Sequence, residues 1–358
     1  DKGIVMAYLP ATAGLEDAPA MGLIAHMDTS PEASGEPAKW QVVDYKGGDI
    51  VLNAEKNIVL TMDRFPGVAK YAGEKLVVTD GTTLLGADDK AGIAIIVETA
   101  RYFVEHPEVP HAKLCFAITP DEEVGRGTEN FDIPAFGAQY AYTFDGDELG
   151  GFETETFNAA MVKVHFEGLN THPGSAKNKM VNAIRMAMDF ISRLPAESIP
   201  EKTEGHEGFF HPMGITGAVR GVDLKMLIRD HNNFRFEERM NYVRKMVEEM
   251  NKVWGNRVTA DIKVQYHNLK NYLDKHPAVC ELAREAYRRI GVEINEKPVR
   301  GGTDGARLSA RGLPTPNLFT GGMNYHGIFE CLSVTGIERA LELGIMLGKM
   351  SAEVKTLD

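Results

Sequence analysis

Short, continuous apolar runs mark the strands expected in the first part of the chain. They cover residues 22–25, 113–119 and 140–144, and each is followed by polar residues. Between the first two, residues 91–104 carry apolar side chains at three- and four-residue spacing, which indicates an amphipathic helix. Strands that are apolar throughout are typical of a parallel or mixed sheet covered by helices. The pattern therefore predicts an α/β fold for this part.

The middle of the chain follows a different pattern, in which apolar and polar residues alternate. Alternation indicates strands with one exposed face, and two longer stretches have the spacing of amphipathic helices. In chain order the elements read strand, helix, strand, strand, helix, strand, which is the split ferredoxin-like arrangement. The predicted strands are residues 160–167, 214–219, 224–229 and 258–266, and the predicted helices are residues 181–194 and 236–254.

The last part of the chain returns to the first pattern. It contains a predicted helix at residues 278–289, a glycine-rich loop at 300–305 and a final helix that begins near Ile337. A length of 358 residues suggests two domains. We therefore expect a larger mixed-sheet domain that is interrupted by a smaller βαββαβ domain. The expected boundaries are 1–156 and 270–358 for the larger domain and 157–269 for the insertion.

Charge and composition narrow the class of protein. The 39 basic and 51 acidic residues give a net charge of −12, which argues against nonspecific nucleic-acid binding because that needs a basic surface. No apolar run approaches the ~20 residues of a membrane helix, and no secretory signal is visible. Cys115, Cys280 and Cys331 lie far apart in apolar surroundings, as expected of free thiols in a reducing cytoplasm. We therefore expect a cytoplasmic protein without nucleic-acid or membrane partners.

Histidine and carboxylate side chains collect in five short polar segments. Each segment follows an apolar run or lies beside glycines, which indicates a loop at a strand end. In sheets of parallel strands, functional groups gather in the loops at the carboxyl ends. The segments are residues 26–30, 86–92, 120–125, 145–148 and 325–327.

Taken singly, several of these residues also have an ordinary structural explanation. A lone histidine at a strand end, such as His26, is more often structural, although Asp28 is close enough to orient it as carboxylates orient metal-bound imidazoles. Asp88 and Asp89 could cap the helix that follows them. Asp145 could belong to a simple acidic turn.

Two further features favour a functional site. Glu122 and Glu123 are adjacent and repel each other, but together they could supply a metal ligand and a general base. His326 lies in a polar, glycine-rich stretch, where a core histidine is less natural. In an ordinary domain, few buried strands are followed by histidine or carboxylate side chains. The co-occurrence of so many of them here therefore indicates a metal site.

The residue types define the class of metal chemistry. Imidazole and carboxylate ligands suit Zn²⁺, Mn²⁺ or Co²⁺, and no thiolate argues for structural zinc. The sequence contains no GxSxG elbow, no GxxxxGK[ST] phosphate loop, no HExxH helix and no GxGxxG fingerprint. The sequence therefore gives no support for a zincin or for a nucleotide-binding protein.

Seven motifs relate these residues to a known family. They are HMDTS, LLGADDKAG, PDEEVGRG, FDGDELG, RGGTDGA, NLFTGG and YHG, and TEGHEGFF and IRD in the inserted part accompany them. In this order and spacing, the chain resembles the M20 family of co-catalytic metallopeptidases, and within it the aminopeptidases that act on tripeptides. The similarity runs through essentially the whole chain. Members of the family begin further upstream, so we expect an N-terminal part to be missing here.

The resemblance implies a zinc-peptidase-like catalytic domain, an inserted lid or dimerisation domain, and two divalent metal ions. Zinc is the expected metal, with manganese and cobalt as alternatives. By this resemblance Asp88 would bridge the two ions, His26 and Asp145 would complete one site, and Glu123 and His326 would complete the other.

The resemblance also implies roles for residues around the metals. Asp28 would orient His26, and Glu122 would be the general base. His172 of the inserted domain would steady the developing oxyanion, and the alternative for this residue is an ordinary loop histidine before a proline. The peptide bond that follows the bridging aspartate would be cis.

Substrate-binding candidates lie in two further segments. Arg229, in the IRD segment, could bind a peptide carboxylate through two nitrogens. The glycine-rich loop could shape the pocket and offer backbone amides to a carboxylate, but a surface arginine and a simple turn would look the same. The candidates in that loop are Arg300, Gly301, Thr303 and Asp304.

The expected activity is release of the N-terminal residue of tripeptides, in peptide catabolism. The expected partner is a short peptide, and a homodimer is one possible assembly. A dipeptidase, a carboxypeptidase or an N-acyl amino-acid deacylase is the first alternative, because pocket contacts rather than metal chemistry separate these activities. A non-catalytic metal- or peptide-binding protein is the second, and the complete set of candidate ligands together with Glu122 argues against it.

Overall fold

A computed structural model describes residues 2–36 and 39–357, which divide into two compact units. The predicted α/β class with a mixed sheet is confirmed, and so is the ferredoxin-like order of the inserted part. Within the described residues, no helix is both long and apolar enough to cross a membrane. Unit 1 comprises Asp1–Thr154, Leu269–Lys297 and Thr303–Asp358, and unit 2 comprises Glu155–Asn268 and Pro298–Gly302.

A seven-stranded mixed sheet forms the centre of unit 1. The three predicted apolar runs are its neighbouring parallel strands β7 (Leu114–Thr119), β2 (Met21–His26) and β8 (Tyr140–Gly146). The order is β1–β7–β2–β8–β15–β9–β14, in which β1 is antiparallel to β7 and β9 is antiparallel to β15. The remaining strands are β1 (Val5–Leu9), β15 (Asn317–Phe319), β9 (Gly151–Glu153) and β14 (Asn295–Glu296).

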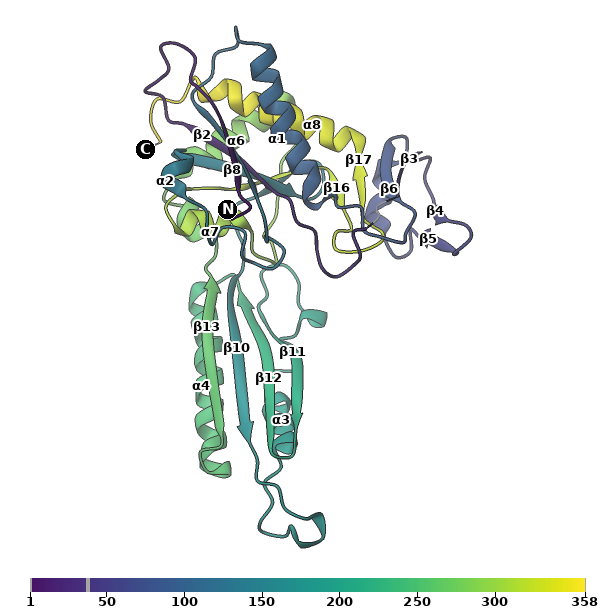
Figure 1. The fold of residues 1–358 in the computed structure, drawn as a ribbon, viewed down its shortest axis with the longest axis vertical. Coiled ribbons are helices and arrows are strands. Elements are labelled where there is room, and N and C mark those ends of the chain that lie inside the picture. Colours follow the sequence, from purple (N-terminus) through teal and green to yellow (C-terminus); the bar gives the residue numbers. More distant parts are fainter. Residues whose placement is uncertain (1, 37–38, 358) are drawn as a thin grey trace. The chain divides into compact units, whose positions relative to one another are not determined.

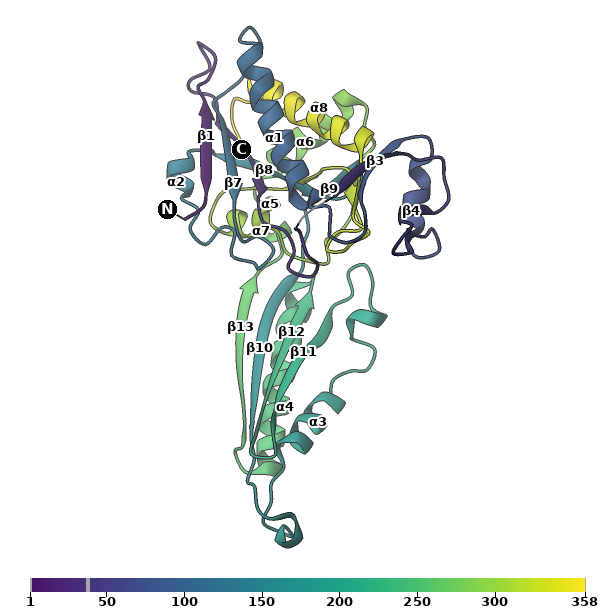
Figure 2. The same cartoon turned by 45° about the vertical axis from the view of Figure 1, so that its right-hand side comes forward.

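Helices cover both faces of this sheet, which explains the apolar runs. Leu23 of β2 packs on one face with three long helices, and Ile24 packs on the other face with two short ones. Gly22 lies against the ring of Phe136, where a Cβ would come within 2.6 Å of a ring carbon, so a glycine is required. In Figures 1 and 2, α1 and α8 lie side by side. The long helices are α1 (Ala87–Glu105), α6 (Pro277–Ile290) and α8 (Val334–Ser351), and the short ones are α2 (Ile133–Phe136) and α7 (Asp304–Ala310).

A second, smaller sheet in unit 1 is absent from the sequence prediction. Its strands are short, and β3 exposes most of its side chains, including Trp40 at 68%. A short, half-exposed strand gives a weak periodic signal. The sheet has the order β16–β17–β6–β3, with β16 (Gly322–Met323), β17 (Cys331–Ser333), β6 (Lys75–Thr79) and β3 (Trp40–Asp44); beside it are the hairpin β4 (Ile50–Asn53) and β5 (Ile58–Leu60) and the 3₁₀ helix η1 (Pro66–Tyr71).

Unit 2 is a four-stranded antiparallel sheet with two helices on one face. The sheet order is β11–β12–β10–β13, and both views show α3 and α4 along the same side of it (Figures 1 and 2). The apolar positions predicted in the second helix, including Met240 and Val243, are buried against the sheet. Burial of each such side chain contributes about 1.5–3 kcal/mol. The elements are β10 (Asn158–Glu167), α3 (Ala183–Ser192), β11 (Phe209–Ala218), β12 (Gly221–Asp230), α4 (Asn233–Trp254) and β13 (Val258–Tyr266), with η2 (Pro173–Ser175) and η3 (Pro200–Lys202) in the loops; α5 (Lys270–Leu273) belongs to unit 1.

Candidate metal centre

Three adjacent parallel strands of unit 1 end at the same edge of the sheet. His26 is the last residue of β2 and pairs with Thr119, the last residue of β7. Asp145 lies near the end of β8, on the other side of β2. Loops at this carboxyl edge are where an α/β sheet gathers functional groups. The fold therefore brings together side chains that are far apart in the sequence.

The five predicted metal ligands form two groups that share Asp88. His26 Nε2 is 2.9 Å from Asp88 Oδ1 and 3.2 Å from Asp145 Oδ1. His326 Nε2 is 3.3 Å from Asp88 Oδ2 and 3.0 Å from Glu123 Oε2. Each oxygen of Asp88 thus faces a different histidine, as a bridging carboxylate requires.

The donor set fits divalent cations. Potential ligand atoms of His26, Asp88 and Glu123 all lie within 4.8 Å of one another. Glu123 Oε1 is buried and has no hydrogen-bond partner, which is costly for a carboxylate unless a cation binds there. Imidazole and carboxylate groups are ligands for Zn²⁺, Mn²⁺ and Co²⁺.

The electrostatics of the cluster follow from crowded carboxylates around two histidines. Burial alone lowers the pKa of His26, but the negative charge of Asp145 and hydrogen bonds to the surrounding aspartates outweigh it and raise that pKa. Hydrogen bonds to Asp88 and Glu123 raise the pKa of His326 to about 10. Burial raises the pKa of Asp145 to about 7, against the positive charge of His26. The acidic cluster therefore attracts positive charge, which protons or metal ions can supply.

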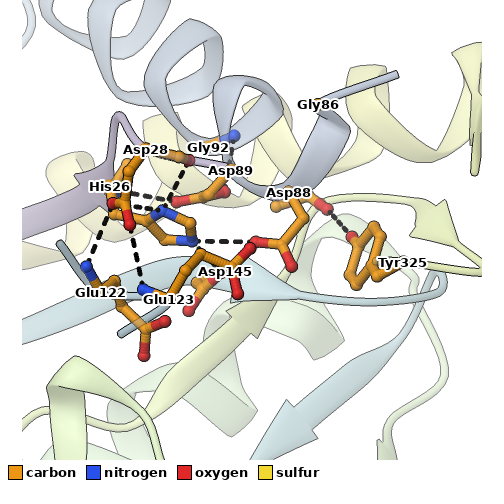
Figure 3. Close-up of polar contacts among 12 residues, drawn as sticks. His26, Asp28, Gly86, Asp88, Asp89, Gly92, Glu122, Glu123, Asp145 and Tyr325 are labelled. Atoms are coloured by element: carbon orange, nitrogen blue, oxygen red, sulfur yellow. Dashed lines mark hydrogen bonds and ion pairs between the residues drawn. The ribbon is translucent and has the colours of Figure 1, made fainter. Parts of the chain in front are cut away.

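Asp28 connects the first histidine to the loop that carries Glu122 and Glu123. Its Oδ1 lies 3.2 Å from His26 Nδ1, the ring nitrogen that faces away from Asp88. The two oxygens of Asp28 also accept the backbone N–H groups of Glu122 and Glu123, each at 3.1 Å (Figure 3). One carboxylate therefore sets the imidazole orientation and holds the loop.

The start of α1 separates the roles of its two aspartates. The Asp88–Asp89 peptide bond is cis, as the family resemblance implied. Asp89 is buried, and its carboxylate accepts the backbone N–H groups of His26 at 3.0 Å and Gly92 at 3.1 Å. Helix capping, the alternative for this pair, thus describes Asp89. Asp88 instead points one oxygen at His26 (Figure 3) and the other at His326.

Glu122 lies in the loop after β7, next to Glu123, and its carboxyl group has a shifted pKa. Burial raises its pKa well above the ordinary value, and the negative charges of Asp145 and Asp304 act in the same direction. Asp304 is itself buried, with Oδ2 accepting the Thr119 hydroxyl at 2.9 Å and Oδ1 without a hydrogen-bond partner. Burial raises the pKa of Asp304 to about 6.

The other predicted site residues have local contacts of their own. Thr303 caps α7 by accepting the Ala306 N–H at 3.2 Å. In unit 2, His172 Nδ1 accepts the Gly174 N–H at 3.1 Å, and Arg229 donates to the Arg300 carbonyl at 3.0 Å. The Arg300 guanidinium donates to the Gly205 and Glu207 carbonyls and to the Thr203 hydroxyl, and the Gly301 carbonyl accepts the Phe157 N–H.

Two supporting contacts were missed by sequence reasoning. Asn317 Oδ1 accepts the Asp145 N–H at 3.1 Å, while its Nδ2 donates to Glu153 at 2.7 Å. Glu330 accepts three backbone N–H groups around Asp88. Asn317 begins the NLFTGG motif, but neither this motif nor the sequence around Glu330 indicates a partner so far along the chain, so only the fold reveals these contacts.

Comparison with known proteins places this architecture among peptidases. Residues 154–255 match the family model described as a peptidase dimerisation domain. Peptidase T of Parabacteroides distasonis is 47% identical, over 98% of this chain and 86% of its own length. Peptidase T of Clostridium acetobutylicum is 48% identical, over 99% of this chain and 87% of its own length.

Solved structures agree with these relatives. The aminopeptidase PepT from Bacillus cereus has a TM-score of 0.75 and 26% identity, covering 98% of this chain and 85% of the other. A dinuclear metal binding peptidase of the M20 family from Bacillus subtilis has a TM-score of 0.64 at 14% identity, covering 99% of this chain and 87% of the other. At that identity, the second likeness is one of fold.

Proposed function

Because this chain belongs to the peptidase T family of M20 metallopeptidases, we propose that it is a dinuclear-metal-dependent aminopeptidase that releases the N-terminal residue of tripeptides. The observation that carries the proposal is the sharing of Asp88 between two groups of ligands, one around His26 and one around His326. A single carboxylate between two histidines suits a pair of metal ions better than one ion.

In the proposed centre, Asp88 would be a ligand shared by both ions. His26 and Asp145 would complete one site, and Glu123 and His326 would complete the other. The unpartnered, buried oxygen of Glu123 supports its assignment as a ligand. Zinc is the proposed metal, and Mn²⁺ and Co²⁺ suit the same ligands.

Glu122 is the proposed general base and acid. When bound, the metal ions lower the pKa of a water molecule and polarise the scissile carbonyl. Glu122 would take the proton of the attacking water and then give it to the leaving amine. Its raised pKa makes it a stronger base than an exposed glutamate, and Asp28 holds its backbone N–H in position. Asp28 also orients the imidazole of His26.

Other residues are proposed to bind the peptide. His172 would donate a hydrogen bond to the developing oxyanion, and Arg229 would bind a carboxylate of the substrate. Thr303 and Asp304 would shape the pocket, since the unpartnered oxygen of Asp304 can accept a donor from a ligand. Arg300 and Gly301 are the other proposed substrate-binding residues, and their contacts within unit 2 hold them in place.

A homodimer is the proposed assembly. Residues 154–255 match a peptidase dimerisation domain, and within unit 2 the edge strand β11 suits pairing with another strand. The second half of β11 is exposed and uncharged, including Met213 and Ile215, whereas edges that avoid pairing usually carry charges. Light scattering of the purified protein tests this, and a monomeric mass at micromolar concentration would oppose it. The cytoplasm is the proposed compartment because the three cysteines are buried free thiols.

A substrate panel tests the activity against its alternatives. The panel contains a free tripeptide, a dipeptide, a tetrapeptide, an N-acetylated tripeptide and an N-acyl amino acid, each with added Zn²⁺, Mn²⁺ or Co²⁺. We expect metal-dependent release of the first residue from the free tripeptide. Preferential cleavage of the dipeptide would favour a dipeptidase, release of the last residue a carboxypeptidase, and cleavage of acylated substrates alone a deacylase.

A further inference from the structure

At the start of α1 the backbone of Asp88 and Asp89 is non-helical, and Asp89 caps the regular helix that follows by accepting the Gly92 N–H at 3.1 Å. Gly86, just before α1, adopts a left-handed conformation with φ of 76° and makes no side-chain capping hydrogen bond. The first backbone N–H groups of a helix have no partner within the helix, and an anion near them is favourable. Here the N–H groups of Leu85, Gly86 and Asp88 precede the regular helix, and all lie within three residues of Asp88, the proposed bridging ligand.

A single distant carboxylate receives these donors. Glu330 Oε2 accepts the N–H groups of Leu85 at 2.8 Å and Gly86 at 2.7 Å, and Oε1 accepts the Asp88 N–H at 3.0 Å. The Glu330 residue is only 2% exposed. Hydrogen bonds from N–H groups to a buried carboxylate are stronger than neutral ones, so the contact fixes the backbone around Asp88 firmly.

Glu330 also belongs to the loop of the second histidine. It follows His326 by four residues, and its own N–H donates to the Gly327 carbonyl at 3.2 Å, which closes a turn. The next residue begins β17, which is paired with β6 and β16. Glu330 is therefore anchored in a sheet on one side and holds the start of α1 on the other. The two loops that it joins bring His326 Nε2 within 3.3 Å of Asp88 Oδ2.

We propose that Glu330 is a positioning residue for the metal centre, which holds the backbone of Leu85, Gly86 and Asp88 so that the Asp88 carboxylate can be shared by both ions. The inference rests on the proposed dinuclear centre. A helix cap alone would stabilise α1 without affecting metal affinity, and this difference separates the two roles.

Metal titration of the metal-free protein tests the proposal. Glu330→Gln keeps the shape of the side chain but removes its charge. It also replaces one acceptor oxygen with an amide NH₂, which cannot accept the backbone N–H groups. We expect the affinity for Mn²⁺ or Zn²⁺, measured by calorimetry, to fall about 10- to 100-fold at both sites. The visible absorption of the Co²⁺-loaded protein should change as well, because the ligand geometry around the bridging carboxylate changes.

Ser333→Ala is the matched control from the same segment. Ser333 is buried, caps α8 by accepting the Gly336 N–H at 3.0 Å, and donates to Glu74. Its loss should lower the thermal midpoint but leave both metal affinities and the Co²⁺ spectrum as in the wild type.

Two results would overturn the proposal. One is a Glu330→Gln protein with wild-type metal affinities and only a lower melting temperature, and the other is an equal loss of affinity in Ser333→Ala. If Glu330→Gln does not fold, Glu330→Asp is compared in the same way, because its shorter side chain cannot reach all three N–H groups. A wild-type protein that binds two ions but cleaves no peptide would refute the proposed activity and leave this test intact.

Discussion

At the scale of single residues, the site depends on carboxylates that each have several partners. Asp88 faces two histidines, and Asp28 contacts one histidine and two backbone N–H groups. Residues that orient metal ligands affect affinity almost as much as the ligands themselves. Substitutions of such residues should therefore change metal binding more than folding.

Asp28→Asn tests this at the first histidine. We expect metal affinity and kcat/KM to fall about 10- to 100-fold, because an amide cannot both accept the two N–H groups and act as a carboxylate toward His26. Calorimetry and tripeptide hydrolysis measure the two quantities. Asp132→Asn is the control, since the Asp132 side chain caps α2 by accepting the Ala135 N–H at 3.0 Å. Equal effects of the two substitutions would count against the orienting role of Asp28.

Glu153 predicts a pH dependence of stability. Burial raises its pKa from 4.5 to about 8, with the Asn317 hydrogen bond acting in the opposite direction. The folded state thus binds this proton more tightly than the unfolded chain, so the stabilisation is complete below about pH 4.5 and is lost as pH rises toward 8.

Glu153→Gln removes this titration and keeps an oxygen for the Asn317 amide. In urea unfolding of metal-free protein between about pH 5 and 8, the wild type should lose stability relative to the variant as pH rises. Parallel pH profiles of the two proteins would show that Glu153 does not titrate in this range.

At the scale of elements, the site depends on how closely α1 approaches the central sheet. A Cβ on Gly92 would lie 1.9 Å from the Phe144 carbonyl oxygen of β8. Gly92 also donates its N–H to Asp89, the neighbour of the proposed bridging ligand Asp88. The glycine therefore permits the contact that brings the start of α1 to His26 and Asp145.

Gly92→Ala should destabilise the protein by about 1–3 kcal/mol or more, because the backbone of β8 cannot move aside cheaply. Gly214→Ala is the control, since no atom lies within 4 Å of the Cβ position there, and its effect should stay within about 0.5 kcal/mol. Urea denaturation measures both, and a neutral Gly92→Ala would contradict the close packing.

The hydrophobic pattern predicts the elements that carry the site. Long or fully buried elements such as β2, β7 and α1 give strong periodic signals, and the order of unit 2 follows from alternation. The pattern does not predict β1 or β3, since both are short and largely exposed. Strand-end positions indicate the polar segments that contain the five candidate ligands, and the family resemblance selects those residues within them. The contact between Glu330 and Leu85 spans 245 residues and has no local signal.

At the scale of the whole molecule, metal binding and folding should be coupled. The candidate ligands come from loops that are distant in sequence, so the complete site exists only in the folded state. A ligand that binds only the folded state stabilises it by about 2.7 kcal/mol at 100 times its dissociation constant. The metal should therefore affect both activity and thermal stability.

Treatment with a chelator should abolish tripeptide hydrolysis and lower the thermal midpoint, and added Zn²⁺, Mn²⁺ or Co²⁺ should restore both. Differential scanning fluorimetry with and without metal measures the shift. Asp88→Ala is the control, because loss of the proposed bridging ligand should remove most of the metal-dependent shift. If the thermal midpoint of the wild type were the same with and without metal, metal binding and folding would not be coupled.

The most direct test of the central claim compares metal-loaded wild type with Glu122→Gln, measuring both bound metal and tripeptide hydrolysis. The account predicts two metal ions in each protein and a kcat that is about 10²- to 10⁴-fold lower in the variant, because only the proton transfer is lost. Wild-type turnover in Glu122→Gln, or a single bound ion in the active wild type, would contradict the account.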